Sequence, residues 1–320
     1  MGRQKPLADC HPAFGRHRGY PPRYGWLRKV HLALLDDPAC LRRPDATVIL
    51  GVGSSMVPAM AFWSQAFGLS SPCDRGLTPT ARGRWLLDEE QGADPFLEEV
   101  ASLYLLHWWL LSATPSHVPS WRYLFGHTGL RSYSRKALHE LITDAAERAG
   151  WRTPAPSVVA NDIACLVSMY APSNPDQPRE RVEDTLLNPF RSLHLLVSGP
   201  SLNGFGDRTH TLTINRTAGQ TCPASVLTYA CLDYAARIRG PGPGSISVAR
   251  LAAAPDGPGR LLLTDTPGLL RALRSTSARH EGLAVTESPT GEDLLCYSVP
   301  PLALAQKILA TAFPQAGGSP

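Results

Sequence analysis

The sequence lacks the motifs that identify several large classes of enzyme. It contains no Walker-type phosphate loop and no nucleophile elbow of the hydrolase type, and no dense nuclease motif stands out. These absences exclude the commonest nucleotide-hydrolysing and serine-hydrolase chemistries. Any hydrolysis by this chain must therefore use residues that no short motif reveals.

Cysteine is sparse and irregularly placed. The seven cysteines are odd in number and include no closely spaced pair. This pattern argues against a disulfide framework or a zinc knuckle and indicates a reducing compartment, the cytoplasm. Cys165 and Cys231 lie within apolar helical patterns, which predicts small buried side chains rather than carriers of sulfur.

Long hydrophobic runs and strong net charge are missing too. The most apolar run, residues 100–111, is shorter than the ~20 residues that span a bilayer, so we expect a buried helix and no membrane segment. Residues 1–14 lack the apolar core of a signal peptide and are expected to form a flexible leader. The net charge of +4 permits a nucleic-acid partner without requiring one.

The most informative stretch is residues 15–69. Apolar residues spaced three and four apart predict a helix over residues 24–35, and Asp45 is a plausible N-cap for a short helix over residues 46–50. Gly51 and Gly53 flank a turn, and Ser54 or Ser55 can cap the next helix. This order predicts a helix-turn-helix whose second helix points its first residues toward the major groove of DNA.

Local charge supports this hypothesis but does not settle it. Before residue 31 the chain has seven basic residues against a single acid, Asp9. Three helices with apolar stripes also suit an ordinary helical core, and a solvated charged face explains the same basic residues.

Two further segments have the composition of functional surfaces. Residues 121–136 mix aromatic side chains with basic ones, including Arg122 and Arg131, which indicates either a second phosphate-binding surface or a loop over the core. Glu183 and Asp184 follow a Pro-rich stretch and would serve either as metal-binding carboxylates or in capping and ion pairing.

The C-terminal region alternates helices and turns. Residues 223–239, 245–254 and 265–277 are predicted to be helices, and residues 283–299 two strands around a turn. Two helices followed by a hairpin resemble a winged helix, which binds DNA or docks proteins. Both functions fit this region equally well.

Five separated motifs together resemble a known family. They are HRGYPPRYGWLRK, ILGVGSSMVPAMAFWSQAFGL, LTPTARGRWLLD, DPFLEEVASLYLLHWWLL and RVEDTLLNPFRSLHLL, in that order along the chain. In this set the chain resembles the SspB-like family of bacterial DNA phosphorothioation (Ssp) systems over residues 14–300. The resemblance implies a DNA-binding protein that nicks one strand and works with a cysteine desulfurase, an ATPase and a sulfur-transfer protein.

The resemblance also assigns positions. His17, Arg23, Trp26 and Lys29 occupy the opening motif, and Gly51, Gly53 and Met56 occupy the turn motif. Around the turn and on the next helix, where basic residues are expected, this chain has Ser54, Ser55, Pro58 and Ala61. Phosphate contact by that helix is therefore in doubt, and Arg23, Arg28 and Lys29 become the better candidates.

Together these observations predict a mainly α protein with small β-hairpins and helix-turn-helix and winged-helix elements in two domains. The expected divisions are a leader at 1–14, a helical domain at 15–200, a winged-helix-like domain at 201–313 and a disordered tail at 314–320. The expected function is binding and nicking of double-stranded DNA with Mg²⁺ or Mn²⁺. A non-catalytic adaptor that recruits the modification enzymes and a transcriptional regulator of the locus remain as alternatives.

The candidate residues fall into two groups. His17 can serve as an acid or base because the reference pKa of histidine is ~6.5, and Glu183 and Asp184 are the candidate catalytic carboxylates. The candidate DNA contacts are Arg16, Arg18, Arg23, Arg28, Lys29, Ser54, Ser55, Arg122 and Arg131.

Overall fold

The computed structural model describes residues 6–129, 131–172, 187–202 and 208–313. It confirms a mainly helical protein with three small antiparallel sheets. Contacts divide the chain into two compact units. The first unit comprises residues 1–84 and 113–215, and the second comprises residues 85–112 and 216–320.

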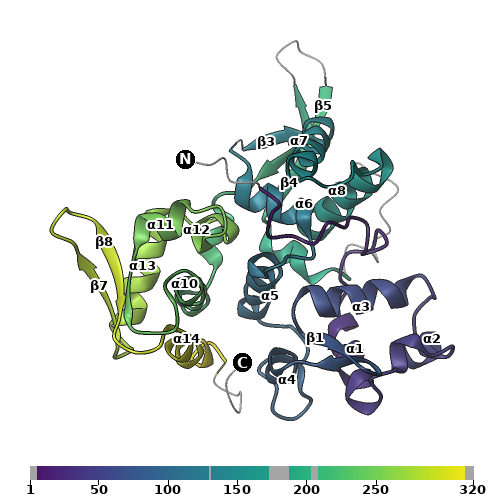
Figure 1. Cartoon of the computed structure of the whole chain (residues 1–320), viewed down its shortest axis with the longest axis horizontal. Coiled ribbons are helices and arrows are strands. Elements are labelled where there is room, and N and C mark those ends of the chain that lie inside the picture. Colours follow the sequence, from purple (N-terminus) through teal and green to yellow (C-terminus); the bar gives the residue numbers. More distant parts are fainter. Residues whose placement is uncertain (1–5, 130, 173–186, 203–207, 314–320) are drawn as a thin grey trace. The chain divides into compact units, whose positions relative to one another are not determined.

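The first unit begins with three consecutive helices. They are α1 (Trp26–Asp36), α2 (Ala46–Leu50) and α3 (Met56–Ala66), with a short 3₁₀ turn, η1 (Cys40–Arg42), between the first two. Figure 1 shows α1, α2 and α3 grouped together, and each helix contacts the other two. The layout expected from the sequence is confirmed, including a left-handed Gly51 (φ +63°) that ends α2.

The prediction of Asp45 as an N-cap is confirmed in position but not in its side-chain bond. Asp45 stands at the N-cap of α2, but its side chain makes no cap hydrogen bond. Its carboxylate instead accepts two hydrogen bonds from Arg43, at 2.9 and 2.7 Å. A charged guanidinium two residues away competes successfully with the backbone N–H groups for the same oxygens.

The rest of the first unit surrounds these helices with short elements. The hairpin β1 (Ser70–Cys73) and β2 (Gly76–Pro79) follows α3, and a second sheet has the order β3-β5-β4. Its strands are β3 (Ser132–Ser134), β4 (Leu196–Leu202) and β5 (Arg208–Ile214). The remaining elements are α6 (Pro119–Arg122), the π-turn η2 (Tyr123–His127), α7 (Arg135–Arg148), α8 (Pro156–Tyr170) and η3 (Pro189–Leu193).

Helix α4 (Ala81–Leu87) leads into the second unit, whose core is built on α5 (Val100–Ser112). The apolar run at residues 100–111, which is too short to span a membrane, forms α5. Every α5 residue after Val100 is buried. In the part of the chain that the structure describes, no helix has the length and apolarity needed to cross a bilayer.

Around α5 the second unit combines helices with a small sheet. Its elements in chain order are η4 (Ala218–Thr221), α10 (Ala224–Arg239), β6 (Gly244–Ser247), α11 (Val248–Ala253), α12 (Pro258–Leu261), α13 (Thr266–Ser277), β7 (Leu283–Glu287), β8 (Asp293–Tyr297) and α14 (Pro301–Ala310). The sheet order is β6-β8-β7, with antiparallel pairs.

The helix predicted over residues 245–254 is partly wrong, because its first residues form strand β6. Ile246 lies opposite Leu295 of β8, and both side chains are buried. Ser247 then ends the strand and caps α11 by accepting a hydrogen bond from the Arg250 N–H at 3.2 Å. Pairing with a distant strand overrides the local helical pattern here.

Candidate nucleic-acid interface

A buried, hydrogen-bonded His–Asp pair organises the loop at residues 15–20. The Nε2 atom of His17 lies 2.9 Å from Oδ1 of Asp162 on α8, and each side chain is 2% exposed. The same carboxylate accepts the Gly15 N–H at 2.7 Å and the Ser120 hydroxyl at 2.8 Å. One aspartate therefore fixes the loop against both α6 and α8.

The hydrogen bonds also define the tautomer of His17. The Gly19 N–H donates to Nδ1 of His17 at 3.0 Å, so the proton of the neutral ring lies on Nε2, which donates to Asp162. The ring packs against aromatic side chains, those of Phe62, Trp63 and Trp121. The acid–base role predicted for His17 does not fit this arrangement, because both nitrogens are engaged and the side chain is enclosed. His17 instead holds the 15–20 loop against the core of the first unit.

Left-handed backbone conformations make the loop tight. Gly15 (φ +70°) and Gly19 (φ +80°) adopt this region, and so does Arg18 (φ +55°), where a side chain costs energy. The Arg18 N–H donates to the Gly15 carbonyl at 3.0 Å, and the Tyr20 N–H donates to the His17 carbonyl at 3.0 Å. Because His17 points inward, Arg16 and Arg18 on either side of it are exposed.

Contacts from Tyr20 join this loop to the start of α3. The Tyr20 hydroxyl lies 3.1 Å from the Ser55 hydroxyl, and the Tyr20 backbone carbonyl accepts the Trp63 indole N–H at 2.8 Å. The Tyr20 ring packs edge-on against Trp26, the first residue of α1. The loop, the start of α1 and the start of α3 therefore lie together.

The predicted cations of residues 16–29 gather around this junction. The Arg16 guanidinium lies 5.7 Å from the centre of the Phe62 ring on α3, and that of Arg23 lies 5.6 Å from the Trp26 ring. Lys29 on α1 donates from Nζ to the Leu50 carbonyl at 3.1 Å, at the end of α2. We call this set the basic junction; it comprises Arg16, Arg18, Arg23, Arg28, Lys29, Ser54 and Ser55.

Helix α3 itself offers only its first end to a partner. Ser54, Ser55 and Pro58 are exposed, whereas seven of the eleven α3 residues are buried. The side chain of Ser55 makes no cap hydrogen bond to the helix. A recognition helix lying lengthwise in a groove needs an exposed polar side, which α3 does not have.

The second predicted phosphate surface is partly wrong. Arg122 on α6 is 3% exposed, so its guanidinium belongs to the interior of the first unit. The tryptophan and tyrosine that flank it, Trp121 and Tyr123, are buried as well and take Arg122 inward with them. Arg131 is exposed just before β3 and remains a predicted contact. Glu183 and Asp184 lie outside the described residues.

Within the described residues, no group of three or more His, Cys, Asp or Glu side chains is placed to hold a metal ion. Because Mg²⁺ is often held by only one or two carboxylates and water molecules, the Mg²⁺ or Mn²⁺ expected from the sequence stays a prediction.

One pair of residues beside the junction was missed by the sequence analysis. The rings of His11 and His117 stack with centres 4.4 Å apart and planes 27° apart. The His11 N–H donates to the Ser116 carbonyl at 2.9 Å, and the Ser116 N–H donates to the Asp9 carbonyl at 2.8 Å. Because the two histidines are far apart in sequence, no local spacing could have indicated the pair.

The electrostatic surroundings keep His117 neutral. Burial, then the positive charges of His11 and Arg16, lower the pKa of His117 to about 4. The His117 ring also contacts the edge of Phe62, with centres 6.5 Å apart, and Phe62 is the ring beneath Arg16. The histidine pair therefore adjoins the basic junction.

The thiols are less reactive than ordinary ones. Burial is the main cause that raises the pKa of five of the seven cysteines, those at positions 10, 40, 165, 222 and 231. Since the thiolate is the reactive form, these five side chains are poor nucleophiles.

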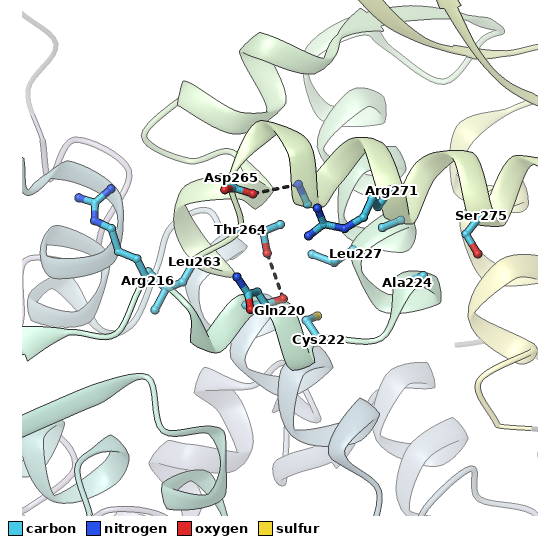
Figure 2. A pocket seen from close by; sticks show the side chains of 13 residues that line it. Arg216, Gln220, Cys222, Ala224, Leu227, Leu263, Thr264, Asp265, Arg271 and Ser275 are labelled. Atoms are coloured by element: carbon cyan, nitrogen blue, oxygen red, sulfur yellow. Dashed lines mark hydrogen bonds between the residues drawn. The ribbon is translucent and has the colours of Figure 1, made fainter.

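The second unit contains a separate pocket of about 220 Å³ between η4 and α13 (Figure 2). Arg271 extends from α13 toward Thr264, and Asp265 accepts the Gly268 N–H at 2.9 Å at the start of the helix. Thr264 in turn donates to the Gly219 carbonyl at 3.4 Å. The pocket is thus lined by polar side chains whose bonds hold the entry to α13.

The chain matches one family and two solved structures. The family described as "Protein of unknown function (DUF4007)" matches residues 14–313. The two structures are described as "Magnesium ion-bound SspB crystal structure" and "SspB crystal structure". Each is 36% identical, covers 97% of this chain and 90% of that chain, and gives a TM-score of 0.86. No match was found among curated proteins. On the strength of a family match from residue 14 to residue 313 and this likeness over nearly its whole length, the chain belongs to the SspB-like family of bacterial DNA phosphorothioation systems.

Proposed function

We propose that this protein binds double-stranded DNA through the basic junction and nicks one strand, so that sulfur can be incorporated into the backbone. Membership of the SspB-like family supports a role in an Ssp phosphorothioation system. The observation that carries the DNA-binding part is that cations of the 15–20 loop and α1 lie against neighbouring helices, with Arg16 over the Phe62 ring of α3 and Lys29 at the Leu50 carbonyl that ends α2.

The geometry suits the backbone of DNA rather than its bases. Arginine and lysine side chains and the N-terminal ends of helices are the usual partners of phosphate oxygens. Ser54 and Ser55 add hydroxyl groups at the start of α3. Such contacts hold a protein on the duplex at any sequence, and they weaken as salt rises.

The second unit is the candidate for a further contact. The element order is α10, β6, α11, α12, α13, β7, β8, and the sheet order is β6-β8-β7. This order supports the proposal of a winged helix, in which α13 would be the recognition helix. Arg271, Arg274 and Ser275 are exposed on α13. This face suits DNA or a partner of the system: the cysteine desulfurase, the ATPase or the sulfur-transfer protein.

The two alternatives of another class are a non-catalytic adaptor and a regulator of the locus. An adaptor would bind DNA without cutting it. A regulator would prefer one operator sequence strongly over others, which requires contacts to base edges.

Conversion of supercoiled plasmid to open circle tests the proposal. The purified protein is assayed with Mg²⁺ or Mn²⁺ beside an EDTA control and a variant carrying Arg23→Ala, Arg28→Ala and Lys29→Ala. The matched control removes three exposed arginines elsewhere on the first unit, Arg75, Arg148 and Arg152. We expect metal-dependent open circles from the wild type and the control variant but few from the junction variant. Intact binding without open circles in either metal would favour the adaptor.

A further inference from the structure

The strand cut needs a group that accepts a proton near the scissile phosphate. The His17 side chain is too enclosed to reach a phosphate. Its side chain is 2% exposed and both ring nitrogens are engaged. Among the other histidines of the first unit, His139 bonds the Pro156 carbonyl through Nε2, on α7. The His11–His117 pair is the one that adjoins the basic junction through Phe62 and Arg16.

Backbone contacts build this pair firmly. Residues 9–11 run beside Ser116 in a parallel bridge, which sets His11 and His117 side by side. Both side chains are partly buried, so neither is a freely rotating surface group. A pre-positioned base of this kind spends little entropy when the substrate arrives.

His117 also carries an unused polar atom. Its Nδ1 atom is buried and has no hydrogen-bond partner among the described residues. Buried polar atoms in native proteins are nearly always bonded, and each exception calls for an explanation. Because Nδ1 is buried, a bound strand would have to meet the His117 ring at its other nitrogen, Nε2.

We propose that the His11–His117 pair is the proton-accepting element of the nick, with His117 as the base and His11 as the residue that positions its ring. The inference rests on the proposed function and names residues for its chemical step. Arg16, whose guanidinium lies over Phe62, would hold the phosphate next to the pair.

The step is a simple hydrolysis. The oxygen of a water molecule forms a bond to phosphorus, and the bond from phosphorus to one deoxyribose oxygen breaks. The proton of the water goes to the neutral imidazole of His117, and the leaving oxygen takes a proton from the solvent. The products are a phosphate monoester end and a hydroxyl end, and no oxidant or reductant takes part.

The test separates catalysis from binding. Nicking of supercoiled plasmid is measured at saturating DNA for His117→Gln, His11→Gln and the control His139→Gln, and DNA affinity is measured by fluorescence anisotropy. Glutamine keeps the hydrogen-bonding capacity but cannot take up the proton. A positioned acid or base usually contributes about 10²- to 10⁴-fold, and a base whose pKa is lowered to about 4 belongs at the low end of that range. We therefore expect His117→Gln to nick about 10²-fold more slowly, with an affinity within twofold of wild type.

A second measurement distinguishes a base from a packing residue. In His117→Ala, added imidazole should restore part of the nicking rate, because it supplies the missing base. Thermal unfolding checks that each variant is folded. His11→Gln should slow nicking less than His117→Gln, and it tests the pair if a His117 variant does not fold. If the wild type nicks and His117→Gln nicks within threefold of the control variant, this inference is overturned and the proposed function stands. An inactive wild type with intact binding overturns both.

Discussion

Helices α3 and α13 are the two candidate recognition helices, and they differ in what they expose. Seven of the eleven residues of α3 are buried, whereas four of the twelve of α13 are. Helix α3 therefore presents only its beginning, next to the basic junction, while α13 presents a side that includes Arg271 and Arg274. The N-terminal end of a helix can bind a phosphate, whereas only the exposed side of a helix can lie along a groove of DNA.

The two helices are also supported differently. The neighbourhood of α3 depends on a polar centre, in which Asp162 holds the 15–20 loop. The neighbourhood of α13 depends on packing against α10 and on His107 of α5, whose Nε2 lies 2.8 Å from the carbonyl of Leu261, the last residue of α12.

Replacing the polar centre should have the largest effect. Asp162→Ala removes the partner of His17 and the acceptor of the Gly15 N–H and Ser120 hydroxyl. A hydrogen bond to a carboxylate is worth about 1.5–3 kcal/mol, so losing these bonds together should lower the unfolding free energy by several times that of a single exposed pair. Urea unfolding measures it, with Asp144→Ala, which breaks an exposed pair with Arg148, as the control expected to change little. Equal losses in the two variants would show that the centre does not support the fold.

The second prediction concerns the loss of folding stability at acidic pH. Burial lowers the pKa of His107 to about 4, below the ordinary value of 6.5. Between these values the unfolded chain binds a proton that the folded chain does not, so stability is lost as pH falls from 6.5 toward 4, by up to about 3 kcal/mol. His107→Gln removes the titrating group and should flatten this part of the stability curve. A curve as steep as that of the wild type would contradict the assignment.

The third prediction compares the DNA contacts. Arg271→Ala with Arg274→Ala removes two charges from the exposed side of α13. If α13 lies in a groove, affinity falls unequally among DNA sequences, by about 1–3 kcal/mol at a preferred site. Competition between oligonucleotides measures the difference. Unchanged DNA binding, with loss of a partner of the modification system in pull-down, would identify α13 as a docking surface.

The smallest effect on DNA affinity is expected when a single residue of the basic junction is replaced. Arg28→Ala should weaken binding equally at every sequence and reduce the slope of log affinity against log salt by about one unit. Titrations of several duplexes at four salt concentrations measure this slope. The same slope as the wild type would place Arg28 outside the phosphate contacts.

Local patterns predicted the helices well and the site only in part. Residues 46–66 carry their own apolar spacing and a glycine turn, so α2, Gly51 and α3 could be predicted from the sequence. Strand β6 could not, because Ile246 is held by Leu295, almost fifty residues away. The histidine pair was hidden for the same reason, since only the folded chain brings its members together.

Burial was the other property that sequence could not give. His17 and Arg122 have the chemistry of contact residues, yet each is nearly inaccessible in the folded protein. In both cases neighbouring aromatic residues take the polar side chain into the core. A motif shows which residues are grouped, but the packing around it decides which of them face a partner.

The protected thiols have a consequence for sulfur traffic. A protein that works beside enzymes that pass activated sulfur risks being sulfurated itself at any accessible thiolate. Here five of seven cysteines are held protonated by burial, which leaves Cys73 and Cys296 as the partly accessible thiols. If a sulfur donor works beside this chain, as proposed, the fold gives that donor few thiols to modify other than its intended target.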